Sequence, residues 1–318
     1  YAVQSEILRY INHVADRLNL RDDIQVETRV TAAVFDEAVN RWTVTTNGDD
    51  NFTTKYCVMA TGCLSTPNLP TFNGLEQFKG DWHHTGFWPK EGVDFTGKRV
   101  GIIGTGSSGI QSIPVIAAQA DHLTVFQRTP NFSIPAWNAV IPDEAERAWK
   151  EAYPELRARA RVSPVGATFD APDISALDYS DAERDAIFEK RWNQGSFNFL
   201  AAFNDLMSNK VANKHAVDFV HRKIHQRVHD PAIAELLCPK DHPLGTKRLC
   251  VDTDYYEAYN RDNVTLVDVR TTPIRQIVQS GLQVGDDTYP LDAIVFATGF
   301  DAMTGALMNI DIRGRGGL

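Results

Sequence analysis

Residues 99–128 read RVGIIGTGSSGIQSIPVIAAQADHLTVFQR, and this stretch decides the fold. An apolar run at 100–103 leads into a GxGxxG turn at 104–109, after which apolar residues recur at helical spacing. A second apolar run follows at 123–127. The order of strand, glycine turn, helix and strand is typical of a dinucleotide-binding unit, in which free N–H groups at the helix start bind the pyrophosphate.

The residues after the second strand indicate which dinucleotide binds. NAD sites offer an acidic side chain to a ribose hydroxyl at this point, whereas this chain has Arg128 and Thr129. We expect these two residues to contact a 2'-phosphate, which makes the cofactor NADP(H). An isolated GxGxxG can also be an ordinary surface turn, but the flanking strands and helix favour the dinucleotide site. The expected pyrophosphate cradle consists of Gly104, Thr105, Gly106, Ser107, Ser108, Gly109, Ile110 and Gln111.

Composition and charge exclude several functional classes. The 318 residues include 32 basic and 41 acidic side chains, for a net charge of -9, and no basic run alternates with aromatic residues. We therefore expect no nucleic acid partner. No apolar run reaches the length that spans a membrane, so we expect no membrane association.

The cysteines and histidines suggest neither disulfides nor a metal centre. The four cysteines have no CxxC or zinc-ligand spacing, which favours unpaired thiols in a reducing compartment and a cytoplasmic location. His221 and His225 could share a helix face, but no HExxH sequence or third ligand accompanies them. The sequence therefore predicts no metal site.

The parts before and after this unit differ in pattern. Strands are expected at 24–30, around Val34, at 42–46 and at 56–60, the last ending in the small residues Thr61 and Gly62. Residues 135–243 are mostly helical in pattern. The capping box of Ser180 with Glu183 and the pair Asp230 and Pro231 each predict the start of a helix there. A further helix is expected over 143–161, divided in two at Pro154.

Residues 78–89, FKGDWHHTGFWP, carry the most specific pattern in the chain. The segment is similar to the FxGxxxHxxxWP sequence that marks Baeyer–Villiger monooxygenases, and it precedes the glycine turn as in that family. The matching residues are Phe78, Gly80, His84, Trp88 and Pro89. The resemblance implies a flavoprotein that uses FAD, NADPH and O2 to convert a ketone to an ester or lactone. It also implies that His84 links segments of the protein rather than acting as a base.

The functional interpretation of the dipeptide Lys247-Arg248 depends on the same resemblance. By itself such a pair is usually a solvated surface pair. The family has a lysine at the NADP 2'-phosphate followed by an arginine over the flavin, which implies that Lys247 binds NADP and that Arg248 is catalytic. A guanidinium suits this position because it donates hydrogen bonds without losing its proton, and it can stabilise a developing oxyanion.

The resemblance also implies the architecture: an α/β flavoprotein with two dinucleotide-binding domains and a mostly helical insertion. Val30, Thr61 and Gly62 would contact FAD. A second Ala-Thr-Gly sequence, residues 297–299, would return the chain to the FAD domain. The expected domains are a partial FAD domain (1–75), a linker (76–97), a Rossmann-like NADP domain (98–134 and 244–292), the helical insertion (135–243) and the return to the FAD domain (293–318).

The family's first glycine turn, which holds the FAD diphosphate, has no counterpart in the chain. We therefore expect an internal fragment that is inactive by itself, from an enzyme resembling the phenylacetone and steroid monooxygenase branch and acting on aryl, cyclic or steroid ketones. Two alternatives remain: a related flavin monooxygenase that oxidises nitrogen or sulfur centres, and an NADP-binding module without activity.

Overall fold

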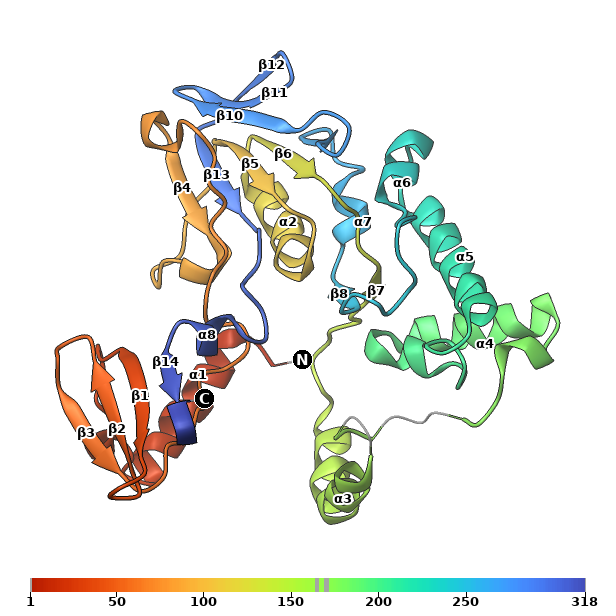
Figure 1. Cartoon of the computed structure of the whole chain (residues 1–318). Coiled ribbons are helices and arrows are strands. Elements are labelled where there is room, and N and C mark those ends of the chain that lie inside the picture. The colour runs from red at the N-terminus through yellow and green to blue at the C-terminus, as the bar shows by residue number, and fades with distance from the viewer. Residues whose placement is uncertain (1, 164–165, 169–171, 318) are drawn as a thin grey trace. The chain divides into compact units, whose positions relative to one another are not determined.

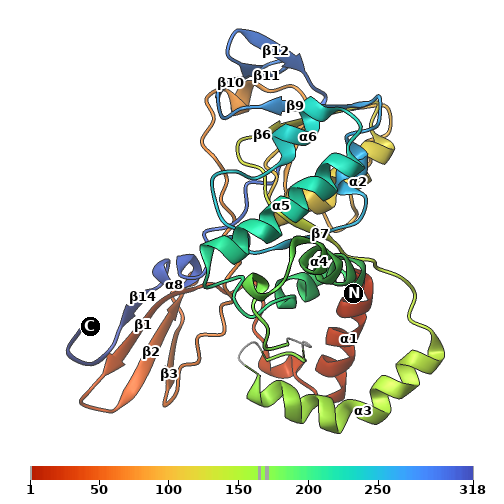
Figure 2. The ribbon, with the colours of Figure 1, turned by 90° about the vertical axis from the view of Figure 1, so that its right-hand side faces the viewer.

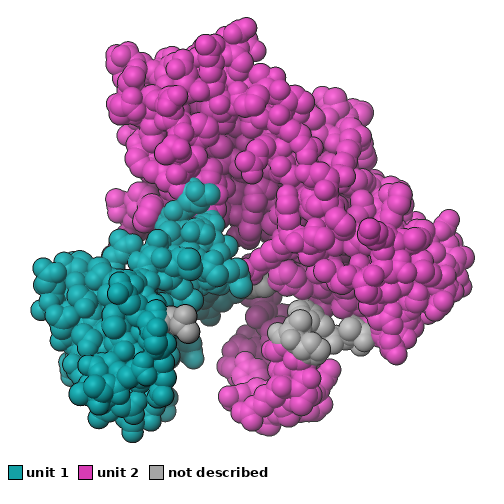
Figure 3. Space-filling view, in the orientation of Figure 1, with its two compact units in different colours: residues 1–68, 300–318 teal, residues 69–299 magenta. Residues whose placement is uncertain are grey.

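A computed structural model describes residues 2–163, 166–168 and 172–317 of the chain. The chain folds into two compact units, which Figure 3 shows in different colours. Unit 1 comprises residues 1–68 and 300–318, and unit 2 comprises residues 69–299. All residues expected to bind NADP therefore lie within unit 2, while the three expected FAD contacts lie within unit 1.

Unit 2 is built on a five-stranded parallel sheet (Figure 1). In spatial order its strands are β4 (Asp81–His84), β13 (Ala293–Phe296), β5 (Arg99–Ile103), β6 (His122–Gln127) and β9 (Val264–Asp268). Helix α2 (Ser107–Gln119) joins β5 to β6 and packs on both strands. The predicted order of strand, glycine turn, helix and strand is confirmed, and α2 continues through Pro114.

Apolar side chains cover both faces of this sheet, which explains why its middle strands are apolar along nearly their whole length. On one face Val100 and Ile102 pack in a cluster with the apolar side of α2. On the other face Phe126 and Phe296 pack against the antiparallel strands β10 (Ile274–Val278), β11 (Gly281–Val284) and β12 (Asp287–Pro290).

The segment between β6 and β9 is mostly helical, as the sequence predicts. Its helices are α3 (Asp143–Val162), α4 (Asp181–Gln194), α5 (Lys210–Arg227), α6 (Pro231–Leu237) and α7 (Tyr255–Ala258), with short 3-10 helices at Ala176–Asp178 and Ser196–Ala201. The capping box at the start of α4 and the cap of α6 by Asp230 are both confirmed. The expected break at Pro154 is wrong, since α3 runs through it as one helix.

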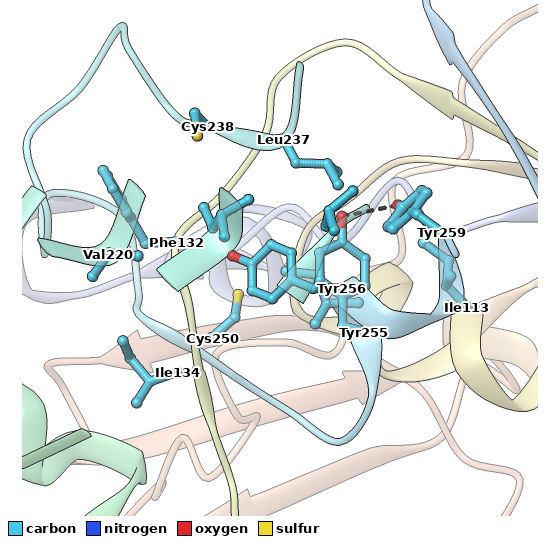
Figure 4. Close-up of a cluster of buried hydrophobic side chains, with 14 of the residues drawn as sticks. Ile113, Phe132, Ile134, Val220, Leu237, Cys238, Cys250, Tyr255, Tyr256 and Tyr259 are labelled. Atoms are coloured by element: carbon cyan, nitrogen blue, oxygen red, sulfur yellow. Dashed lines mark hydrogen bonds between the residues drawn. The ribbon is translucent and has the colours of Figure 1, made fainter. Parts of the chain in front are cut away.

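Short strands β7 (Ser133–Pro135) and β8 (Cys250–Asp252) pair in parallel beside α2 and α7. Figure 4 shows the apolar core around them, in which Phe132 and Cys250 lie among residues of α5, α6 and α7. The hydroxyl of Tyr259 donates to that of Tyr255 at 3.0 Å inside this core. Figure 2 shows α5 and α6 in a view turned by 90° from that of Figure 1. This packing fixes the segments that precede β7 and β8.

Unit 1 contains a four-stranded sheet in the order β14-β1-β2-β3. Its strands are β14 (Asp311–Arg313), β1 (Val30–Asp36), β2 (Arg41–Thr46) and β3 (Asn51–Thr54), accompanied by helices α1 (Gln4–Arg17) and α8 (Gly305–Met308) and short 3-10 helices at Arg21–Asp23 and Arg315–Gly317. The strand expected at 24–30 is wrong, because β1 begins only at Val30.

The strand expected at 56–60 is also wrong. This segment is irregular, and its Tyr56 and Val58 are 73% and 84% exposed. A strand needs a neighbour for its backbone N–H and C=O groups, and within the described part of the chain no strand pairs with residues 56–60. None of the described helices combines the length and the apolar character needed to cross a membrane.

Candidate dinucleotide-binding site

The three glycines of the turn between β5 and α2 have different surroundings. Gly104 has φ +107°, and a Cβ there would lie 2.5 Å from the Ala297 carbonyl oxygen. A Cβ on Gly109 would lie 2.2 Å from the Gly104 carbonyl oxygen. A Cβ on Gly106 would meet nothing within 4 Å. Gly104 and Gly109 therefore let the turn, helix and β13 pack closely, whereas Gly106 leaves open space where a ligand can reach the backbone.

The start of α2 is free to bind an anion. No side chain caps it at Gly106. At its other end, the Asn263 side chain donates to the carbonyls of Ala117 and Ala120 at 3.0 and 2.9 Å. Asn263 thus satisfies two backbone carbonyls at the C-terminus of α2, whereas no side chain among the described residues caps the N-terminus, where the helix dipole favours negative charge. This combination fits a dinucleotide pyrophosphate.

The segments that carry the expected phosphate ligands converge beside this helix start. Phe132 accepts a hydrogen bond from the backbone N–H of Cys250 at 3.1 Å. The Asn131 side chain donates to the Cys250 sulfur at 3.1 Å, and the Ser107 side chain hydrogen-bonds the same thiol. Cys250 is therefore the point where α2, the loop after β6 and the segment before β8 meet, and burial raises the pKa of its thiol to about 11.

Arg128, Lys247 and Arg248 lie on these two segments, and all three are exposed. Thr129 is tied to the turn, since its carbonyl accepts a bond from the Thr105 hydroxyl at 3.0 Å. None of the three basic side chains forms an ion pair with another described residue. Their charges are available to a phosphate near the helix start.

His84 is 1% exposed and connects two segments of unit 2. Its Nδ1 accepts from the Gly86 backbone N–H at 2.9 Å, and its Nε2 lies 3.2 Å from the Thr298 hydroxyl. Thr298 follows β13, which pairs with β4 so that Phe296 lies opposite His84. The histidine therefore ties the edge strand to the Ala-Thr-Gly sequence at 297–299.

The other residues of the 78–89 segment have packing roles. A Cβ on Gly80 would lie 2.3 Å from the Asp292 carbonyl oxygen and 2.7 Å from the Phe78 ring, so the position requires glycine. The Trp88 ring packs 6.1 Å from that of Phe95, and Pro89 follows it. A cavity of about 500 Å³ lies between this connector and α2, and Trp88, Phe95, Ser108 and Gln111 are among the residues that line it.

The three expected FAD contacts are not joined in unit 1. Val30 begins β1 and pairs with Thr46 of β2. Thr61 and Gly62 lie in an irregular segment, where the Thr61 carbonyl accepts a bond from the Ser65 hydroxyl. No hydrogen bond between described residues links Val30 to either of them.

Sequence reasoning missed the thiol at Cys250 and the amide of Asn131, which hold the site's segments together. Neither residue belongs to a recognisable pattern, and their contacts span more than a hundred residues. Only the position of Cys250 two residues after Arg248 could have drawn attention to it.

Comparison with known proteins finds flavin-dependent monooxygenases. Residues 1–137 match the family model described as flavin-binding monooxygenase-like. The chain is 44% identical over 322 residues to 2-oxo-Delta(3)-4,5,5-trimethylcyclopentenylacetyl-CoA monooxygenase from Pseudomonas putida, covering 99% of this chain and 59% of that protein. It is 43% identical over 321 residues to a Baeyer–Villiger monooxygenase from Pseudooceanicola batsensis, covering 100% and 58%.

Another relative has a different chemistry in its name. Phenazine N-monooxygenase PhzNO1 from Lysobacter antibioticus is 40% identical over 320 residues, covering 100% of this chain and 59% of that protein. The chain thus spans about three fifths of the length of the curated relatives it matches.

Solved structures share the whole fold of the chain. An oxidized steroid monooxygenase bound to NADP superposes with a TM-score of 0.97 at 52% identity, covering 100% of this chain and 61% of that one. OTEMO in complex with FAD and NADP superposes with a TM-score of 0.96 at 44% identity, with the same coverage. The 78–89 segment, the glycine turn and these likenesses agree: the chain is similar over its whole length to Baeyer–Villiger monooxygenases, and its residues 1–137 match the flavin-binding monooxygenase-like family model.

Proposed function

We propose that this chain binds NADP(H) and forms part of the FAD site of an NADPH- and O2-dependent monooxygenase that inserts one oxygen next to a ketone carbonyl. The observation that carries the proposal is the glycine turn, where packing demands glycine at 104 and 109 and open space surrounds Gly106 beside an uncapped helix. A pyrophosphate can approach the backbone there. The cradle extends over residues 104–111.

Specificity for NADP(H) over NAD(H) rests on exposed cations without an internal partner. Arg128 and Lys247 bind the 2'-phosphate by charge-assisted hydrogen bonds, and the backbone of Thr129 is held in place by the Thr105 hydroxyl. Neither cation forms an ion pair with another described residue, so binding the phosphate breaks no ion pair within the part of the chain that the structure describes.

A bound FAD would supply the redox chemistry that links NADPH to O2, and the residues of this chain would hold and orient the two cofactors. Arg248 is the catalytic residue of this proposal. It holds a permanent positive charge one residue beyond the phosphate ligand Lys247, and it would donate hydrogen bonds to negative charge that develops on the ketone oxygen. In this proposal Val30, Thr61 and Gly62 contact FAD. The FAD domain, the linker, the NADP domain and the helical insertion have the residue ranges expected from the sequence.

His84 serves as a structural link in this assembly. It is buried and bonded through both ring nitrogens, to Gly86 and to the Thr298 hydroxyl. Such an imidazole is not free to accept a proton from a substrate. We assign it to holding Thr298, next to the point where the chain passes to Phe300 of unit 1.

The substrate is an aryl, cyclic or steroid ketone and the product an ester or lactone. A second candidate is nitrogen oxidation, because one relative that the chain matches over its full length is named a phenazine N-monooxygenase. The four cysteines form no disulfide, which fits a reducing compartment and a cytoplasmic location.

The test is a chimera in which this chain replaces the matching segment of the steroid monooxygenase, whose fold it shares at a TM-score of 0.97. The chimera is supplied with FAD, NADPH and O2, and offered a panel of ketones and, separately, phenazines. Esters or lactones from the ketones support the proposal. N-oxides without any ester would assign the chain to nitrogen oxidation instead, and NADPH consumption that yields only hydrogen peroxide would refute both.

A further inference from the structure

Three side chains with metal-binding atoms gather between α5 and α6, outside the dinucleotide site. They are His225 of α5, Glu235 of α6 and Cys238 directly after α6, and one ligand atom of each lies within 4.8 Å of the other two. His225 Nε2 is 3.2 Å from Glu235 Oε2. Two ligands bonded to one tetrahedral Zn²⁺ at about 2.0–2.1 Å lie about 3.3 Å apart, so this pair already has the spacing of a metal site.

The backbone around Cys238 is fixed on both sides. The buried Gln127 side chain donates to the Leu236 carbonyl at 2.8 Å, which ties the end of α6 to the central sheet. The Nε2 of His221 lies 2.9 Å from the Pro239 carbonyl oxygen, which ties the following residue to α5. The thiol is therefore held in position beside α5 by contacts that do not use its sulfur, and His221 is already engaged.

The cluster contains one ionised carboxylate and one buried thiol. Lys240 forms an ion pair with Glu235 Oε1 and keeps the pKa of this carboxyl below its usual range, while Oε2 faces His225. The thiol of Cys238 is 2% exposed, and burial raises its pKa to about 12. Without a metal it is neutral, and a bound metal ion would take the place of its proton.

We propose that His225, Glu235 and Cys238 bind one Zn²⁺-like transition metal ion that clamps α5 to α6. Imidazole and thiolate ligands select zinc and related ions, whereas Mg²⁺ and Ca²⁺ prefer oxygen ligands alone. On binding, a Zn–S bond replaces the S–H bond of Cys238, and the proton leaves to solvent. The metal stays divalent, and water completes the fourth position. Glu235 and Cys238 come from α6 and the residue after it, ten or more residues from His225 in the sequence. This distance explains why the spacing around His221 and His225 revealed no third ligand.

The test uses the full chain, freed of metal with a chelator and titrated with Zn²⁺ alone by calorimetry and with Co²⁺ by absorption. We expect one tight equivalent and, with Co²⁺, a thiolate-to-cobalt charge-transfer band. Cys238→Ser removes that band, and His225→Ala and Glu235→Gln each weaken Zn²⁺ binding at least about tenfold. Zn²⁺ also raises the melting temperature of the chain and not that of Cys238→Ser.

Matched controls separate this site from adventitious binding. Cys63→Ser removes an exposed thiol and His229→Ala an exposed histidine, and neither changes the affinity of the tight site. Cys238 is buried, so its replacement can disturb the fold. Glu235 is exposed, and Glu235→Gln therefore tests metal binding in a chain whose fold is intact. Unchanged binding in His225→Ala and Glu235→Gln, or no tight equivalent in the unmodified chain, overturns the proposal.

Discussion

Replacing Arg128 with alanine isolates the contribution of one charge to cofactor selection. The side chain is exposed and forms no ion pair with another described residue, so its removal leaves no buried partner unsatisfied and changes the stability of the fold by less than about 0.5 kcal/mol. A hydrogen bond to a charged group contributes about 1.5–3 kcal/mol, which corresponds to about 10- to 150-fold in affinity. Because Lys247 is proposed to bind the same phosphate and both side chains are exposed, we expect a loss near the lower end, about tenfold.

The assay compares NADP+ and NAD+ binding to the chain and to Arg128→Ala by calorimetry at low and physiological ionic strength. The variant loses NADP+ affinity while its NAD+ affinity stays the same, and the difference narrows as salt screens the charge. Arg147→Ala, which removes an exposed charge on α3, is the matched control and leaves both affinities unchanged. An unaltered preference for NADP+ in Arg128→Ala would refute the assignment of this residue to the 2'-phosphate.

Three further outcomes follow from the same geometry. Gly109→Ala places a Cβ 2.2 Å from the Gly104 carbonyl oxygen and lowers the free energy of unfolding by about 1–3 kcal/mol. Gly106→Ala instead preserves the melting temperature within a few degrees and weakens NADP+ binding at least about tenfold. Equal losses of stability for the two variants in urea titrations would contradict this difference. In the chimera, Arg248→Ala keeps NADPH-dependent flavin reduction but loses ester formation, and a normal yield of ester would remove this residue from the mechanism. The hydrogen bonds and charge of Arg99 lower the pKa of Asp292 to about 2. The stabilisation of the fold by this ion pair is therefore complete above the unfolded-state pKa near 3.8 and disappears as pH falls toward 2. In acid titrations Asp292→Asn should lose less stability between these two pH values than the unmodified chain.

Local patterns predicted the elements that depend on neighbouring residues. The glycine turn with its flanking strands, the capping box at Ser180 and the proline start of α6 are all present, because each needs only side chains a few residues apart. The error at Pro154 has a local cause as well. The residues around it are strong helix formers, and α3 continues through the proline despite the lost hydrogen bond.

Contacts between distant residues could not be predicted from spacing. The apolar run at 56–60 has the composition of a buried strand, but a strand exists only where another strand pairs with it. Likewise, the meeting of Asn131 with Cys250 and of His225 with Cys238 depends on how helices and strands pack. The sequence led us to propose cations for the candidate site, but it did not reveal the thiol of Cys250 and the amide of Asn131, which hold their segments together.

The most direct test of the proposed activity is the fate of molecular oxygen. The chimera that carries this chain is incubated with FAD, NADPH and a ketone under 18O2, and the product is analysed by mass spectrometry. The account predicts an ester or lactone that contains one labelled oxygen for each NADPH consumed. A chimera that binds FAD and is reduced by NADPH, yet returns the ketone unchanged and releases all the label as hydrogen peroxide, would contradict it.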